Sequence, residues 1–191
     1  MRTADVKRKT KETDIAVELS LDGGKCSVST GIGFFDHMLT AFAVHGVFGL
    51  TLKAVGDLEV DGHHTVEDIG IVLGKAFAAA LGDRSGIARY GSFYIPMDEA
   101  LALCVVDISG RPYLVFDDPF ENQIIGGFDA CLVTEFLRAF AMNAGFTLHM
   151  NILYGKNAHH MAEAVFKALG HALKAACSVT DGNILSTKGV L

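Results

Sequence analysis

The segments "HHTVE" at His63–Glu67 and "HHMAE" at His159–Glu163 are two copies of one motif, 96 positions apart. On a helix, the Glu follows the two histidines by four and three residues, so imidazole and carboxylate can face one site. Adjacent histidines point roughly 100° apart on a helix, so one pair does not readily chelate a single ion. A solvated surface doublet is the alternative for one copy alone. The repeated motif predicts two metal sites.

The similarity continues on both sides of the motif in the same register. Eight of the twenty positions of 61–80 are identical in 157–176, and "GLTL" at 49–52 matches "GFTL" at 145–148. Each half therefore carries the same strand before the same helix. The pattern predicts a fold built by internal duplication.

The spacing of apolar residues assigns the other elements. Alternation over Thr13–Leu21, followed by Gly23-Gly24, predicts an antiparallel hairpin with "KCSVST" at 25–30. Asp61 and Asn157 are the expected N-caps of the helices that carry the motif. The remaining expected elements are helices at 35–45, 62–81, 130–144 and 158–177, and strands at 50–55, 90–95, 101–108, 113–116 and 147–153.

Together these elements predict an α+β fold. Each half is a roughly four-stranded sheet with two helices on one face, in the outline order β-β-α-β-α. Because the apolar sides of the helices must be covered, we expect the two helix pairs to pack together between the sheets. No Pro-rich or Ser-rich linker interrupts the chain. We therefore expect one domain over 1–191, with repeats at about 1–86 and 87–191.

The composition excludes several classes of partner. The net charge is −6 and no basic run is present, which argues against nucleic acid as the main partner and favours a small polar substrate. No apolar run approaches the roughly 20 residues that cross a bilayer. The four cysteines lack C-x-x-C spacing and the N-terminal segment lacks the apolar core of a signal peptide. We expect a soluble cytoplasmic protein with reduced cysteines.

The chemistry of the motif side chains limits the metal. Imidazole and carboxylate donors without cysteine suit Mn, Fe, Co, Ni or Zn, and a structural zinc site is disfavoured. His45, His149 and His171 stand apart from the motifs and are expected to be structural or surface residues. Arg89, Arg111 and Lys188 each lie near glycine and small hydroxyl residues, where a phosphate can approach. Taken singly, each of these cations is expected to be an ordinary surface charge.

Longer motifs carry a resemblance to a known family. They are "GIGFFDHML" at 31–39, "DGHHTVEDIGIVLGKA" at 61–76, "PMDEAL" at 96–101, "DISGRPY" at 107–113, "GKNAHHMAEAVFKA" at 155–168 and "STKGVL" at 186–191. In this order they closely resemble the imidazoleglycerol-phosphate dehydratases of histidine biosynthesis, over essentially the whole chain. The resemblance implies a hydro-lyase that converts D-erythro-imidazole glycerol phosphate to imidazole acetol phosphate. It also implies two Mn²⁺ ions per active site and a homo-oligomer, of 24 subunits in this family, with sites shared between subunits.

The resemblance also assigns roles to residues. Metal binding falls to His37, His63, His64, Glu67, Glu135, His159, His160 and Glu163. The family usually has a His in an "EHFF"-like segment where this chain has Glu135 in "TEFL", and Glu is an acceptable oxygen ligand. Catalytic roles are assigned to Glu12, Glu67 and Glu163, and Glu12 in "KET" resembles the family's acid/base carboxylate. Substrate binding is assigned to Glu12, Arg89, Arg111, Lys167, Ser186, Thr187 and Lys188.

The reaction explains why such groups are needed. The substrate loses a hydroxyl from the carbon attached to imidazole and a proton from the next carbon, which no carbonyl acidifies. Two metals on the ring nitrogens would favour an imidazolate that can expel hydroxide. Glu12 would carry the proton, while the cationic set fixes the phosphate.

Two rival functions compete with the dehydratase. A non-catalytic metal-binding assembly leaves Arg89, Arg111 and Lys188 without a role. A di-metal phosphoesterase usually relies on Asp-rich strand ends, whereas the expected ligands here are helical and mainly His.

Overall fold

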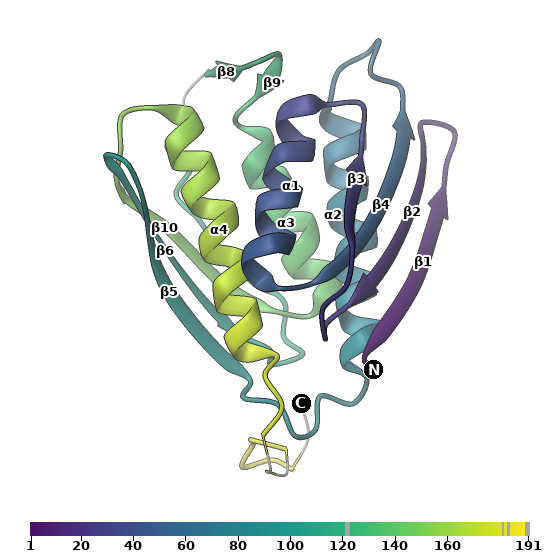
Figure 1. The fold of residues 1–191 in the computed structure, drawn as a ribbon, viewed down its shortest axis with the longest axis vertical. Helices are drawn as coiled ribbons and strands as arrows, with labels where there is room; N and C mark the ends of the chain where they lie inside the picture. The colour runs from purple at the N-terminus through teal and green to yellow at the C-terminus, as the bar shows by residue number, and fades with distance from the viewer. Residues whose placement is uncertain (121–122, 181, 183, 190–191) are drawn as a thin grey trace.

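Two four-stranded sheets enclose four helices in the computed structural model, which describes residues 1–120, 123–180, 182 and 184–189 (Figure 1). The first half contains β1 (Thr3–Lys9), β2 (Thr13–Ser20), β3 (Cys26–Ser29), α1 (Gly33–Gly46), β4 (Gly49–Gly56) and α2 (His63–Leu81). The second half contains β5 (Tyr90–Met97), β6 (Ala100–Asp107), β7 (Tyr113–Val115), β8 (Ile124–Ile125), β9 (Phe128–Asp129), α3 (Leu132–Ala144), β10 (Thr147–Tyr154) and α4 (Ala158–Ala176). Among the described residues, no helix is long and apolar enough to cross a membrane.

The two sheets have the same topology. Their strand orders are β1-β2-β4-β3 and β5-β6-β10-β7. In each sheet the first two pairings are antiparallel and the last is parallel. The short hairpin β8-β9 is the main addition to the second half. The duplication and the α+β fold class are therefore confirmed.

The expected hairpin between Thr13–Leu21 and 25–30 is wrong. β3 pairs in parallel with β4, with Cys26 opposite Leu50, and β4 lies between β3 and β2. Positive φ angles at Gly23 and Gly24 do turn the chain, but into a crossover to the far side of β4. The hairpin that contains β2 is instead formed with β1, whose three basic residues over 7–9 hide its apolar alternation. Each half therefore reads β-β-β-α-β-α.

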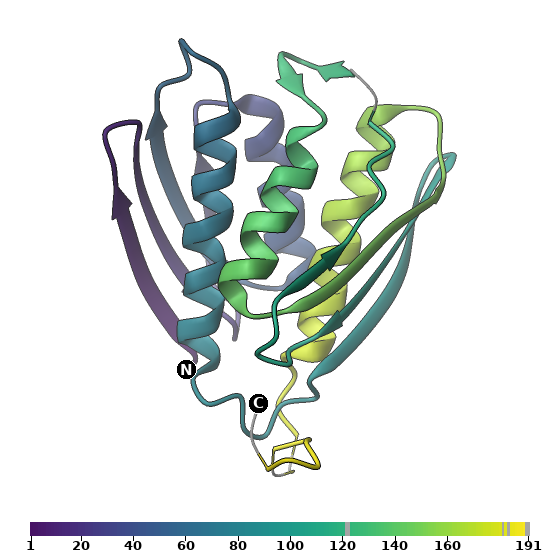
Figure 2. The ribbon, with the colours of Figure 1, turned by 180° about the vertical axis from the view of Figure 1, so that it is seen from behind.

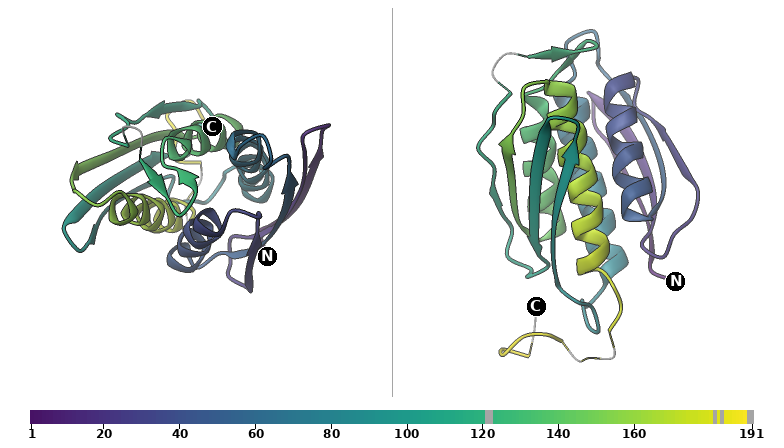
Figure 3. Two further views of the ribbon diagram at one scale, coloured as in Figure 1. Left: turned by 90° about the horizontal axis from the view of Figure 1, so that it is seen from above. Right: turned by 60° about the vertical axis from the view of Figure 1, so that its left-hand side comes forward.

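The four helices form the middle layer, as expected (Figure 2, Figure 3). α1 packs on α4, and α2 packs on α3. Glycines at equivalent positions permit both contacts, because a Cβ at Gly74 would lie 2.6 Å from the Phe140 carbonyl oxygen and one at Gly170 2.5 Å from that of Phe42. The rings of Phe42, Phe77 and Phe140 meet between the two pairs, with centroids 5.4–6.3 Å apart. One apolar core thus joins the halves.

The two expected N-caps differ in outcome. Asn157 caps α4 as expected, and its side chain accepts the backbone N–H of His159 at 2.9 Å. In α2 the N-cap position belongs to Gly62, so the expectation for Asp61 is wrong by one residue. Asp61 Oδ1 still accepts the backbone N–H of His63 at 2.7 Å. Both of these hydrogen bonds stabilise the first helical turn, which carries the His-His motif.

Candidate metal centre and active site

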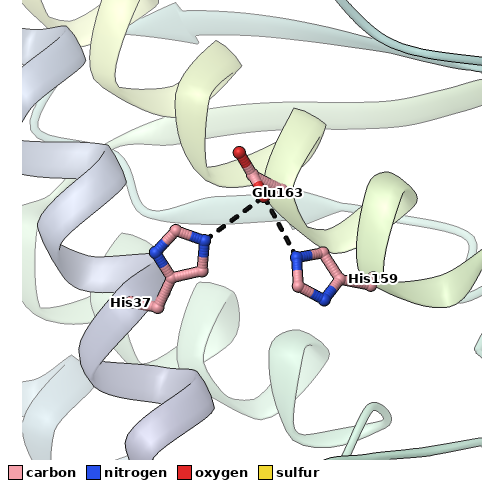
Figure 4. A group of neighbouring side chains, drawn as sticks. All are labelled: His37, His159 and Glu163. Carbon is pink, nitrogen blue, oxygen red and sulfur yellow. Dashed lines mark hydrogen bonds and ion pairs between the residues drawn. The ribbon is translucent and has the colours of Figure 1, made fainter.

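The metal motifs occupy the first turns of α2 and α4, at the same end of the helix layer (Figure 1). His159 and Glu163 on α4 meet His37 on α1, and both imidazoles point at the carboxylate (Figure 4). Glu163 Oε2 lies 3.3 Å from His37 Nε2 and 3.1 Å from His159 Nε2. One donor atom from each residue lies within 4.8 Å of the other two, and no other such trio of His, Cys, Asp or Glu occurs in the described ranges.

Burial and charge prepare Glu163 to act as an anionic ligand. Its side chain is 10% exposed, whereas those of His37 and His159 are 51% and 42% exposed. Burial alone would raise the pKa of Glu163, but the Lys167 ammonium 2.6 Å away and hydrogen bonds from His37 and His159 lower the pKa below its usual value. The carboxylate is therefore ionised at neutral pH. It forms the buried part of a site whose two imidazoles are exposed to solvent.

The motif of the first half is arranged more loosely. His63 Nε2 lies 4.0 Å from Glu67 Oε2, and His64 turns away to place Nδ1 3.0 Å from Asp57 Oδ2. That hydrogen bond raises the pKa of His64, with smaller contributions from nearby carboxylates that include Glu12. The expected acid/base residue Glu12 therefore lies on the β1–β2 turn close to this motif. His63 also borders a cleft of about 440 Å³.

His160 repeats the behaviour of His64. Its Nδ1 lies 2.6 Å from Glu99 Oε2, and its Nε2 is 3.5 Å from Asp98 Oδ2. The hydrogen bond raises the pKa of His160 and lowers that of Glu99 to about 2. His160 is therefore not part of the trio around Glu163, and its ring points toward the β5–β6 turn.

Glu135 lies in the first turn of α3, where both its oxygens accept from Arg138 Nη1 at 2.7 Å. The structure brings it together with this guanidinium three residues later and not with the trio. Its assignment as a metal ligand stays a prediction. The ion pair between Glu135 and Arg138 has a signal in the sequence, because residues at i and i+3 are neighbours on a helix surface.

The expected phosphate-binding residues gather in a separate cleft of about 860 Å³. Arg89, Arg111, Ser186, Thr187 and Lys188 all line it. Arg89 is buried, and its Nε and Nη2 donate to the Asp107 carboxylate at 2.7 and 3.1 Å, while Nη1 donates to the Leu185 carbonyl. That bond ties the C-terminal segment to the second sheet. Arg111 and Lys188 are exposed and able to reach an anion.

Lys167 and Glu12, also expected to bind substrate, lie with the metal motifs instead. The metal motifs and the cationic cleft lie at opposite ends of α4. The backbone N–H of Arg89 bonds the Ala176 carbonyl at the end of the helix, whereas His159 stands at its start. A helix of 19 residues is about 28 Å long.

Three further residues were not found from the sequence. Asp57 and Glu99 hold histidines, and Asp107 holds Arg89. Their signals are weak, because each is an isolated carboxylate whose partner is supplied by another element. His45 and His171 contact each other between α1 and α4, with Nδ1 and Nε2 3.2 Å apart, in keeping with a structural role.

Comparison with known proteins points to one family. The family model for imidazoleglycerol-phosphate dehydratase matches residues 30–173. Dehydratases of that name from Methylorubrum extorquens and Thermoanaerobacter pseudethanolicus are 56% and 58% identical to this chain, each over 100% of both sequences. The crystal structure of the Staphylococcus aureus enzyme superimposes with a TM-score of 0.84 at 42% identity, covering 93% of this chain and 100% of that one. The Pyrococcus furiosus enzyme, in complex with (S)-C348, gives 0.85 at 43% identity, covering 97% and 99%.

Proposed function

Since the chain belongs to the imidazoleglycerol-phosphate dehydratase family, a family of lyases in histidine biosynthesis, we propose that it dehydrates imidazole glycerol phosphate to imidazole acetol phosphate with two Mn²⁺ ions per site. The observation that carries the metal is the trio of His37, His159 and Glu163. A buried, ionised carboxylate between two imidazoles is a donor set that suits Mn²⁺.

Other residues would complete the metal sites. Mn²⁺ favours six ligands, so three donors leave positions for further ligands and for substrate. His63, His64, Glu67, Glu135 and His160 are the remaining candidates. His64 and His160 engage carboxylates through Nδ1, so Nε2 would be their ligand atom. Nε2 of His160 also lies 3.5 Å from Asp98 Oδ2.

The metal and this chain's residues have different tasks. When bound, the ions would supply Lewis acidity that stabilises negative charge on the imidazole ring. Glu12 is exposed and close to His64, and its carboxylate would take the proton from the carbon next to the one that loses hydroxyl. Glu67 and Glu163 would contribute charge at the ring. Arg111, Ser186 and Lys188 would hold the phosphate and so orient the carbons.

The distance between the two groups of residues supports a shared site. From ring to phosphate the substrate spans about seven bonds, on the order of 10 Å. The metal trio and the cationic cleft lie at opposite ends of a 19-residue helix. One copy therefore cannot offer both ends to one substrate. We extend the proposal to a homo-oligomer in which one copy supplies the metal end and another the phosphate end; the number 24 rests on the family resemblance.

The alternative of a non-catalytic metal-binding assembly accounts for the trio alone. It gives no role to a cleft in which Arg89 is buried and held by Asp107 while Arg111 and Lys188 stay exposed. The dehydratase function gives a role to both the metal trio and the cationic cleft. The four unpaired thiols support a reducing compartment, and we propose the cytoplasm.

Turnover of imidazole glycerol phosphate, followed by the ultraviolet absorbance of its product, tests the function. We expect Mn²⁺-dependent product formation by the wild type. Lys188→Ala and Arg111→Ala should each raise KM by about 10- to 100-fold, because a charge-assisted contact to phosphate is worth about 1.5–3 kcal/mol. Lys53→Ala, which removes an exposed lysine on β4, is the control. Absence of product would reject the function, and wild-type KM in both cleft variants would reject the phosphate assignment.

Glu135 offers a test of the ligand set. We expect Glu135→Ala to weaken Mn²⁺ binding about tenfold or more, whereas Glu135→His should retain it, because oxygen and nitrogen donors both suit the ion. Arg138→Ala removes the partner and leaves the carboxylate, so its affinity should equal or exceed that of the wild type. Calorimetric titration with Mn²⁺ measures all four proteins. Identical isotherms would remove Glu135 from the site.

A further inference from the structure

In both halves, a carboxylate from outside the motif holds the second histidine. His64 Nδ1 lies 3.0 Å from Asp57 Oδ2, and His160 Nδ1 lies 2.6 Å from Glu99 Oε2. An ionised carboxylate only accepts hydrogen bonds, so the bonded Nδ1 carries the proton. In a neutral ring the lone pair is then on Nε2, which is the atom that can bind a metal. Nε2 of His160 lies 3.5 Å from Asp98 Oδ2, so it has to turn from that carboxylate to an ion.

Glu99 is fixed by more than the histidine. It lies in the two-residue turn between β5 and β6, after Asp98, whose φ is 47°. Its Oε1 accepts the backbone N–H groups of Lys156 and Asn157 at 3.1 and 2.8 Å, just before α4. Its Oε2 is therefore held toward His160. One side chain joins the turn, the start of the helix and the imidazole.

Asp57 reaches the same arrangement from a different element. It follows β4, its side chain is 19% exposed, and its Oδ1 is buried without a hydrogen-bond partner among the described residues. The residue 96 positions further on is Leu153, so Asp57 and Glu99 do not correspond in the repeat. The same contact, from a carboxylate to Nδ1 of the second histidine, therefore occurs in both halves although the two carboxylates come from positions that do not correspond. This recurrence indicates that the orientation of the second histidine is itself required.

The position equivalent to Glu99 in the first half is Glu12, because each residue directly precedes the second strand of its hairpin. The side chain of Glu12 makes no hydrogen bond with any residue in the described ranges, although it lies near His64. With Asp57 holding His64, the hairpin carboxylate of the first half is released for another task.

We propose that Asp57 and Glu99 are positioning residues that hold His64 and His160 in the Nδ1–H tautomer and direct Nε2 at the metal. This inference rests on the proposed metal sites, and it divides the two hairpin carboxylates between proton transfer at Glu12 and ligand orientation at Glu99.

Glu99→Gln separates orientation from helix capping. The amide oxygen still accepts the two N–H groups before α4, so the amide NH₂ faces His160 Nδ1. That contact favours the opposite tautomer, with the proton on Nε2. We expect Mn²⁺ affinity, measured by calorimetric titration with MnCl₂, to fall by about 10- to 100-fold. The unfolding temperature of the metal-free protein should change little, because the ion pair between Glu99 and His160 is exposed. Asp57→Asn should weaken Mn²⁺ binding in the same way.

Two controls test whether the loss of Mn²⁺ affinity is caused by the lost contact with the histidine. Asp61→Asn removes a carboxylate that accepts a backbone N–H at the start of α2 without touching an imidazole, and should leave Mn²⁺ affinity unchanged. In a His160→Ala background, Glu99→Gln should cause no further loss, because its partner is gone. An undiminished further loss there, or wild-type isotherms for Glu99→Gln and Asp57→Asn, would overturn the proposal. The titrations need no substrate, so absence of turnover by the wild type would reject the proposed function and leave this result standing.

Discussion

Stripping Mn²⁺ with a chelator is expected to lower the rate of dehydration by about three orders of magnitude or more and to break the assembly into smaller species. The rate falls because Lewis acidity worth several kcal/mol is lost, and about 4 kcal/mol corresponds to a thousandfold. The assembly loosens because the proposed site lies between copies, so an ion bound there stabilises the assembled state and its removal withdraws that stabilisation. Each subunit should stay folded, since Glu163 keeps its contacts with His37, His159 and Lys167 without metal.

Size-exclusion chromatography and the absorbance assay, before and after chelation, measure the two effects. Far-ultraviolet circular dichroism checks that the subunit remains folded. Adding Mn²⁺ back should restore both size and rate. A chelated protein of unchanged size would contradict the assembly part, and turnover that survives chelation would contradict the catalytic part.

The elements that the sequence predicts well are those with a local signal. The helices carrying the motif are predicted within a residue or two, because capping side chains and apolar periodicity are contained in the segments themselves. The duplication is visible because the motif keeps its spacing. β3 was misassigned because strand pairing is not local, and the turn at Gly23-Gly24 leads equally well to a hairpin or to a crossover around β4.

The candidate site divides in the same way. The contact of His159 with Glu163 follows from helical spacing. The contact of His37 with Glu163 could not be predicted in this way, because it depends on how α1 packs against α4. The cationic cleft depends on Arg89, which holds a segment almost a hundred residues later at Leu185. The distance between cleft and metal motifs depends on the tertiary fold, and no spacing in the sequence reveals it. Asp57 and Glu99 were missed because a single carboxylate in a turn is usually solvated.

If the active site is shared between copies, two inactive variants that each lack a different part of it should form some complete sites when they are mixed. His159→Ala removes a donor from the metal end, and the double variant Arg111→Ala/Lys188→Ala removes two cations from the phosphate end. At low substrate concentration each assembly alone should be nearly inactive. In assemblies formed from equal amounts of both, each end of a site comes from its intact copy half of the time. About a quarter of the sites are then complete, if two copies supply each site.

The most direct measurement is the dehydration rate of such mixed assemblies, formed by combining metal-free subunits and adding Mn²⁺. Mixing His159→Ala with Glu163→Ala, which damage the same end, is the control and should recover nothing. We expect the His159→Ala and Arg111→Ala/Lys188→Ala mixture to regain about a quarter of the wild-type rate. A mixture no more active than its two components would contradict a site shared between copies.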